Sequence, residues 1–443
     1  MEKKLSKWEA SAIGLGNIIG AGIFVLAGTT IYDAGPGALI AFAITAVLAL
    51  TIALNSAELS SKIITHGGLY SFAKETMGDS AGFMVGWLRS ISYSIAASAV
   101  ALGFGAYLLS FFSLPYYFVI IAAAGMIAFA TFLNYVGISA VARVEKYLVI
   151  LTVAGLVLFI IVSILYGKWE VSRFTPLAPM GFESIIVAAS LSFFAYSGFN
   201  TIATLTPEVK NGSKNVPFAI IFALVVSTVL YILVVTGMLA LMPWQNYSIS
   251  ADPLTNALHF SNAPVFVGYA IAVVAIIATF TVTVSLIVAG SRTLLQMSED
   301  KVLPEWIQGR HKDSPRKAVI LIGALAIAAL FLGNVQIIAL ASNFGVIFSY
   351  ALTGLFVVIL RHRKVKGEFS SPLYPYVQIV SVLLSLLIMY ALGVRAIYLG
   401  FITIIVGMMI YYFEKEARAK KPEHINQSSN TKNMDSNPGK VQN

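Results

Sequence analysis

The sequence predicts an all-helical integral membrane protein with about twelve transmembrane helices. Hydrophobic residues make up 58% of the 443 residues, and charged residues only 11%, whereas soluble domains carry roughly 25% charged residues. The mean hydropathy is +0.84. Apolar runs of about 20 residues, the length of a helix that crosses a ~30 Å hydrocarbon layer, recur along the whole chain. They are apolar on all sides, which favours helices over the alternating strands of a membrane barrel.

The predicted spans follow one another with short connections. The first apolar run is too long for the hydrophobic part of a signal peptide, so it counts as a span. The short segment 1–9 before it and the polar segment 414–443, which we expect to be disordered, complete the chain. We place the spans at 10–32, 37–61, 80–112, 116–135, 145–167, 182–206, 216–242, 264–296, 317–334, 336–360, 374–392 and 396–413.

The basic residues sort to one side of this topology. With a cytoplasmic N-terminus, 25 of the 29 Lys and Arg residues fall in cytoplasmic segments; Lys168, Arg173 and Arg395 fall outside, and Arg89 within a span. This asymmetry follows the positive-inside rule. The net charge of +9 is therefore a topological signal and indicates a lipid bilayer, not a nucleic acid, as the partner. We expect a multi-pass protein of the cell (plasma) membrane with both termini in the cytoplasm.

Glycines interrupt the first predicted span near its middle. The run 18–24 reads Ile-Ile-Gly-Ala-Gly-Ile-Phe, with Gly20 and Gly22 on either side of Ala21. Glycine in a helix interior costs about 1 kcal/mol relative to alanine. The run therefore predicts a local break in the helix. The alternative is close helix packing, because Gly16 and Gly20 also form a small-xxx-small pattern.

The sixth predicted span contains a second interruption. Ser197 and Gly198 lie mid-span, and polar Asn200 and Thr201 follow. Breaks in the first and sixth spans are what two inverted five-helix repeats would place face to face. Unwound backbone at bilayer depth is tolerated where it lines a cavity. Bare N–H groups attract anions and bare C=O groups attract cations, so the paired breaks predict a site for a zwitterion.

Four stretches of this sequence resemble the amino acid–polyamine–organocation superfamily of transporters, closest to its cationic amino acid transporter and prokaryotic permease branches. They are 14–37, 67–73, 194–209 and 291–306. The resemblance implies a leucine-transporter-like fold with a first five-helix repeat at 10–167, an inverted second repeat at 168–360, and two additional helices at 361–413. It further implies secondary transport of amino acids by alternating access.

The resemblance also implies a substrate site within these stretches. The N–H groups of Gly20, Ala21 and Gly22 would bind the substrate carboxylate, and Phe194 would close over the bound side chain. Glu208 would belong to the cytoplasmic gate. The carbonyls expected to bind the substrate ammonium are those of Ile18, Phe194, Ala195 and Ser197, and Ile23 and Gly198 complete the expected site.

Two departures from the family pattern concern the coupling ion. The family often has an acidic residue where this chain has Asn200, and some proton-coupled relatives have a lysine where this chain has Thr152. A neutral Thr152 would leave room for a cation, with Thr281, Thr283 and Ser285 as candidate ligands. The alternative for these three hydroxyls is ordinary helix–helix hydrogen bonding. The sequence thus leaves H⁺ and Na⁺ open as coupling ions.

Arg89 is the basic residue that falls inside a span. An ionisable residue at that depth is a functional candidate, although Arg89 lies close enough to the cytoplasmic end to snorkel to water. Glu58 is its candidate partner. Tyr93 lies one helical turn further on and is a gating candidate, with helix packing as the alternative.

These observations favour a secondary active transporter over a channel or an embedded enzyme. The sequence shows no selectivity-filter motif, no surface cluster of catalytic side chains, no nucleotide-binding loop and no metal-ligand spacing, so we expect no enzymatic activity, no cofactor and no metal. Because the expected pocket holds no acidic side chain, we expect a neutral, fairly apolar amino acid. Alternatives are an amino acid exchanger and a polyamine or organocation transporter, and the protein is expected to be a monomer or homodimer.

Overall fold

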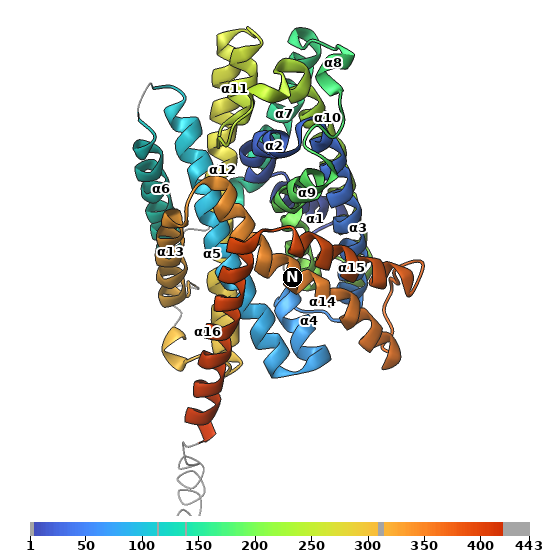
Figure 1. Ribbon diagram of the computed structural model, residues 1–443. Coiled ribbons are helices and arrows are strands. Elements are labelled where there is room, and N and C mark those ends of the chain that lie inside the picture. Colours follow the sequence, from blue (N-terminus) through green and yellow to red (C-terminus); the bar gives the residue numbers. More distant parts are fainter. Residues whose placement is uncertain (1–3, 113–114, 138–139, 309–313, 420–443) are drawn as a thin grey trace, which may run out of the picture.

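A computed structural model describes residues 4–112, 115–137, 140–308 and 314–419. The chain forms a long helical bundle with short connections (Figure 1). Its helices are α1 (Lys7–Ile18), α2 (Ala21–Ala34), α3 (Ala38–Lys62), α4 (Gly68–Met77), α5 (Asp79–Leu109), α6 (Tyr117–Val136), α7 (Ala140–Tyr166), α8 (Val171–Phe174), α9 (Phe182–Tyr196), α10 (Gly212–Leu241), α11 (Pro253–Phe260), α12 (Val265–Glu299), α13 (Arg316–Ala329), α14 (Val335–His362), α15 (Tyr376–Tyr390) and α16 (Val394–Ala419).

Short 3₁₀ segments join or extend several of these helices. They are η1 (Gly35–Gly37), η2 (Ser197–Glu208), η3 (Trp244–Asn246), η4 (Glu305–Ile307) and η5 (Leu330–Leu332). The longest, η2, continues α9 and occupies the second half of the sixth predicted span.

Nine helical segments of the described chain are long and apolar enough to cross a membrane. The first of them, Gly22–Lys62, contains parts of two predicted spans, because η1 joins α2 to α3 with almost no interruption. The predicted spans at 317–334 and 374–392 coincide with α13 and α15, which have 14 and 15 residues. Both are shorter than the usual crossing length of about 20 residues. The multi-span helical class is therefore confirmed.

Burial separates central helices from peripheral ones. Most of the apolar window is buried in Phe182–Glu208 (72%) and Val335–His362 (67%), but little of it in Tyr117–Val136 (28%) and Val394–Arg418 (17%). The exposed positions of the peripheral helices carry large apolar side chains such as Phe129 and Phe401. This arrangement is the one expected when hydrocarbon, not water, surrounds the bundle.

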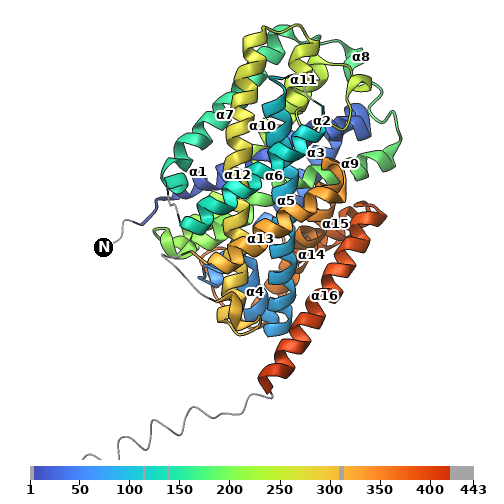
Figure 2. The same cartoon turned by 90° about the vertical axis from the view of Figure 1, so that its left-hand side faces the viewer.

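The long helices pack around α5. This helix lies against α12 and α14, while α3 lies against α10. The short helices α4 and α11 lie at opposite ends of the bundle, α4 near the end where α16 leaves it and α11 at the same end as α8 (Figures 1 and 2). In the predicted topology, 62–79 and the C-terminal segment share one side. The predicted tail beyond residue 419 lies outside the described residues.

The candidate ion pair between Glu58 and Arg89 is wrong. The Glu58 carboxylate is fully buried between α3 and α14, where it accepts hydrogen bonds from Lys62 Nζ at 2.7 Å and Arg361 Nη2 at 2.7 Å. The backbone N–H of Ser371 donates to the same carboxylate at 2.8 Å. Arg361 is more than 300 residues away along the chain, so the sequence held no local signal for this pair.

Candidate functional site

The first predicted span is broken between α1 and α2. Helix α1 ends at Ile18, and α2 begins at Ala21, with Ile19 (φ −76°, ψ 67°) and Gly20 (φ −112°, ψ −148°) between them. No side chain of the described residues caps Gly20. The Gly20 N–H donates to the Ile18 carbonyl at 2.8 Å, so the expectation that it binds the substrate carboxylate is wrong. Since the first amides of a helix have no carbonyl partner within it, Ala21 and Gly22 present free N–H groups at the positive end of the helix dipole.

Both interpretations of the glycines in this span hold, at different positions. A Cβ atom on Gly22 would lie 2.3 Å from Ala195 Cα, so α2 touches the backbone of α9 there. Gly16 likewise packs on Val149, whereas Gly20 forms the N-cap of α2 at the break.

The sixth predicted span changes helix type at the expected place. Helix α9 ends at Tyr196, and η2 starts at Ser197. Hydroxyl groups accompany the tighter winding: Thr201 Oγ1 donates to the Gly198 carbonyl at 2.7 Å, and Thr204 Oγ1 to the Thr201 carbonyl at 2.7 Å. Among the carbonyls predicted to be bare, that of Phe194 accepts from the Ser197 N–H and from Ser197 Oγ at 3.0 Å, a bond that hydroxyls in helices often make.

The two broken spans lie against each other. Helix α2 packs on α9, and α1 packs on η2. A Cβ atom on Gly198 would lie 1.9 Å from the Asn17 carbonyl oxygen, which shows how closely the two backbones approach. The breaks therefore face each other, as the sequence predicted.

Two buried tyrosines from other helices hold the carbonyls at the breaks. The Tyr231 hydroxyl of α10 bonds to the Ile18 carbonyl and lies 3.0 Å from the Ala195 carbonyl. The Tyr350 hydroxyl of α14 donates to the Ser197 carbonyl at 2.6 Å. A buried tyrosine hydroxyl needs such a partner, but the sequence did not show which carbonyl it would find. The Ile18 carbonyl also accepts from the Gly20 N–H at 2.8 Å, so both of its lone pairs are used.

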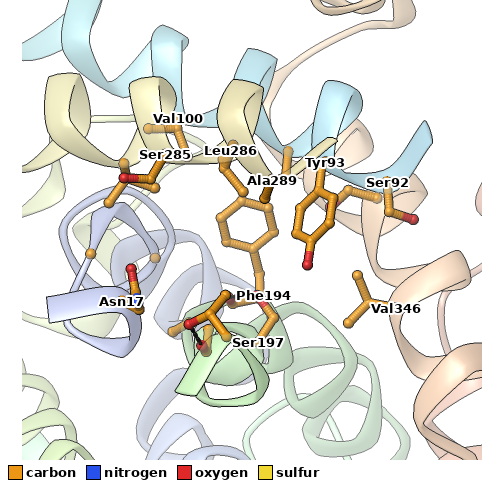
Figure 3. A pocket seen from close by; sticks show the side chains of 18 of the residues that line it. Asn17, Ser92, Tyr93, Val100, Phe194, Ser197, Ser285, Leu286, Ala289 and Val346 are labelled. Carbon is orange, nitrogen blue, oxygen red and sulfur yellow. Dashed lines mark hydrogen bonds between the residues drawn. The ribbon is translucent and has the colours of Figure 1, made fainter. Parts of the chain in front are cut away.

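A cavity of about 80 Å³ lies at this junction (Figure 3). Five elements contribute to it: the α1–α2 break, α5, α9 with η2, α12 and α14. Its lining residues are Asn17, Ile18, Gly20, Gly22, Arg89, Ser92, Tyr93, Ala96, Val100, Phe194, Ala195, Ser197, Gly198, Thr201, Val282, Ser285, Leu286, Ala289, Ser342, Asn343 and Val346.

Most of the expected substrate-binding residues line this cavity, together with the gating candidate Tyr93. The expected ones that do so are Ile18, Gly20, Gly22, Phe194, Ala195, Ser197 and Gly198. Ala21 is the first residue of α2, between two lining glycines. The Phe194 ring stands in the middle of the cavity, with Asn17 and Ser285 on one side and Tyr93 and Val346 on the other (Figure 3).

The remaining expected residues lie away from the lining. Ile23 is buried in the core, and Asn200 is buried on η2. The Thr152 hydroxyl donates to the Leu148 carbonyl at 2.9 Å, and the Thr283 hydroxyl to the Thr279 carbonyl at 3.0 Å. Both bonds run within single helices, and so does the bond of the Thr281 hydroxyl to the Ile277 carbonyl at 2.8 Å. The alternative of hydrogen bonds between helices is therefore wrong for Thr281 and Thr283.

Glu208 lies at the end of η2, where the N-terminal segment joins it. The Leu5 N–H donates to the Glu208 carbonyl at 2.9 Å, and the Lys210 N–H donates to the Leu5 carbonyl at 2.9 Å. The Glu208 carboxylate is half-exposed and lies 3.6 Å from Nδ1 of His66. The segment before α1 is thus tied to the end of the sixth predicted span.

The 3.6-residue periodicity of a helix relates further residues that line the cavity on α5 and α12. On α5, positions 89, 92, 93, 96 and 100 line the cavity, and on α12 positions 282, 285, 286 and 289 do so. These are the i, i+3, i+4, i+7 intervals of one helix face. The sequence did not show which face of these uniformly apolar helices turns inward, because that depends on packing between distant segments.

Arg89 is buried at the cavity, with 6% of its surface exposed. Its Nη2 donates to the Tyr93 hydroxyl, and the guanidinium lies 4.6 Å from the Tyr93 ring centroid and 5.1 Å from that of Tyr350. Its Nη1 has no hydrogen-bond partner among the described residues. Arg89 therefore does not snorkel to water and instead places a positive charge beside the cavity.

Broken helices facing each other across a central cavity, in a bundle of membrane-length helices, define a membrane transporter rather than a channel with a carbonyl filter. The amino acid permease family model matches residues 5–411, so the chain belongs to this family of the amino acid–polyamine–organocation superfamily. Family membership confirms the predicted class: an amino acid transporter with multiple membrane spans, not an enzyme.

The names of individual relatives specify different transported molecules. The methylthioribose transporter of Bacillus subtilis is 33% identical over 435 residues, covering 93% of both chains. The branched-chain amino acid permease BcaP of the same organism is 29% identical over 95% of this chain and 94% of its own. The vacuolar cationic amino acid transporter 4 of Arabidopsis thaliana is 29% identical over 83% of this chain and 64% of its own.

Proposed function

We propose that this protein moves a neutral amino acid across the cell membrane by alternating access, with the substrate held at the α1–α2 break. The observation that carries the proposal is the cavity between the two breaks, into which the start of α2 brings free N–H groups. These groups suit the substrate carboxylate. Carbonyl oxygens of Ala195 and Ser197 lie at the same junction and suit its ammonium group.

The contacts between helices support two inverted repeats of five spans. The first and sixth spans touch through α2 with α9 and α1 with η2. The corresponding later pairs α3 with α10, α5 with α12, and α6 with α13 are also in contact. The short helix α4 follows α3 at one end of the bundle, and α11 follows α10 at the other (Figure 1). This is the relation that an in-plane pseudo-twofold axis produces.

On this arrangement the chain has twelve spans, with α13 and α15 crossing as short helices and α15–α16 added after the second repeat. Both termini then lie in the cytoplasm. Shorter helices cross when the bilayer thins locally or when neighbouring helices cover their ends.

The lining of the cavity supports a neutral, largely apolar substrate. Val100, Val282, Leu286 and Val346 form apolar walls, and no carboxylate lines the described cavity. A cationic side chain would find no counter-charge there, which distinguishes the site from one for polyamines. Tight saturable binding of arginine, without competition from leucine, alanine or glutamate, would refute this preference.

Uptake into proteoliposomes tests the proposal. The purified protein is supplied with a mixed pool of radiolabelled amino acids, under a proton gradient or a sodium gradient imposed separately. Accumulation under one gradient establishes symport and names the ion, whereas uptake that requires a preloaded lumen establishes exchange. No uptake of any amino acid, together with uptake of methylthioribose or a polyamine, would overturn the proposed substrate class.

A further inference from the structure

The guanidinium of Arg89, whose Nη1 has no hydrogen-bond partner among the described residues, makes the two ends of the cavity chemically different. Arg89, Ser92 and Tyr93 come from α5, and Asn343 comes from α14. Figure 3 shows Ser92 and Tyr93 across the Phe194 ring from Asn17, which belongs to the α1–α2 break. The Asn17 side of the ring thus holds the start of α2, whose N–H groups suit a carboxylate, and the Tyr93 side holds the positive charge of Arg89. The Ser197 carbonyl lies between them, bonded to Tyr350, whose ring contacts the Arg89 guanidinium.

A buried charge without a partner is costly, so its surroundings indicate what completes it. Burying an ionised group is tolerated when it is paired and fully hydrogen-bonded. Arg89 has Tyr93 as a hydrogen-bond acceptor and two aromatic rings, but no carboxylate within 4 Å among the described residues. The candidate counter-ion Glu58 is taken by Lys62 and Arg361. The tyrosine rings attract the cation without satisfying its remaining N–H groups.

We propose that Arg89 is a specificity-determining residue that binds a hydrogen-bond acceptor at the tip of the substrate side chain and rejects cationic side chains. The inference rests on the proposed function. The substrate then has an apolar stem along Phe194 and Leu286 and a neutral amide at its end. Asn343 Oδ1, which also lacks a partner among the described residues, can accept from the amide of such a tip.

The alternative source of the acceptor is a small free anion. Chloride or a similar ion beside Arg89 would neutralise the charge as well as a carboxylate does. The two sources differ in one respect: a free anion makes transport depend on the salt present, whereas a substrate tip makes it depend on the side chain.

The experiment compares competition by glutamine, glutamate, leucine and lysine in proteoliposomes. The variants are Arg89→Gln and Arg89→Lys, with Arg395→Gln, an exposed arginine of α16, as the matched control. Each preference is expressed as the ratio of inhibition constants to that of leucine. This ratio removes differences in folded protein between preparations.

In the unaltered protein, glutamine competes more strongly than leucine, and lysine does not compete. A net hydrogen bond to a charged group corresponds to a roughly 10- to 100-fold preference, and Arg89→Gln removes it and admits lysine. Arg89→Lys keeps lysine excluded but weakens the acceptor preference, because lysine lacks the planar fork. Arg395→Gln behaves as the unaltered protein.

Unchanged ratios in Arg89→Gln, with leucine still transported, overturn this inference and leave the proposed function standing. A second outcome also overturns the inference, in favour of a free anion. In it, transport is lost when gluconate replaces chloride, and glutamine and glutamate compete no better than leucine. If the unaltered protein transports no amino acid at all, the proposed function itself has failed.

Discussion

Replacing Gly22 by alanine tests whether the contact between the two breaks controls transport. The added Cβ atom would lie 2.3 Å from Ala195 Cα and 2.9 Å from Ala195 N. These are backbone atoms, so α2 and α9 must separate by about 1 Å to restore ordinary contact. Overpacking of this kind costs about 1–3 kcal/mol. We expect uptake to fall at least tenfold while membrane insertion is kept.

Two other glycines provide the comparison. At Gly20 the new atom would meet Val282 Cγ2 at 2.6 Å, a side chain that can shift, so Gly20→Ala should retain more uptake than Gly22→Ala. At Gly125 of α6, nothing lies within 4 Å, and alanine should be neutral or slightly stabilising. The assay is radiolabelled uptake normalised to the monodisperse protein in each preparation. Unaltered uptake by Gly22→Ala, or equal losses at all three positions, would refute the reasoning.

Three further outcomes follow from buried polar contacts. Glu58→Gln leaves Arg361 without its charge partner, and loss of one partner of a buried pair costs about 3–5 kcal/mol; thermal unfolding in detergent should begin much earlier than for Glu183→Gln, an exposed site. Tyr231→Phe removes the hydroxyl that bonds two carbonyls at the breaks and should lower substrate affinity more than expression, measured by binding and by yield. Burial opposes the charge of Asp300, but hydrogen bonds from neighbouring side chains lower its pKa. Its contribution to stability is therefore present above about pH 4 and is lost as the pH falls further. Asp300→Asn should flatten the pH dependence of thermal unfolding over that range.

The fold class and both breaks were predictable because they depend on local composition. Apolar length marks a span wherever it occurs, and the backbone does break at Gly20 and change helix type at Ser197. The backbone groups exposed at the two breaks belong to residues adjacent to the breaks in sequence. Most of the expected substrate-binding residues therefore line the cavity.

The rest depends on contacts between distant segments. The sequence did not reveal that Tyr231 and Tyr350 would hold the carbonyls at the breaks, because nothing near either tyrosine indicates its partner. It suggested Glu58 for Arg89 because Glu58 lies at the cytoplasmic end of the second predicted span, but α14 brings Arg361 to Glu58 instead. Spans that are apolar on all sides carry little information about which face turns inward, so the polar end of the cavity became visible only in three dimensions.

The most direct test of the account is protection of the cavity by substrate. The chain contains no cysteine, so Ser285→Cys places a single thiol in the lining, and Ser172→Cys on α8 places one on an exposed surface. Both are treated with a small thiol reagent, with and without the transported amino acid. The account predicts that substrate slows the modification of Ser285→Cys at least fivefold and leaves Ser172→Cys unchanged. Equal modification rates at Ser285→Cys with and without a saturating transported substrate would contradict a binding site at the junction of the two breaks.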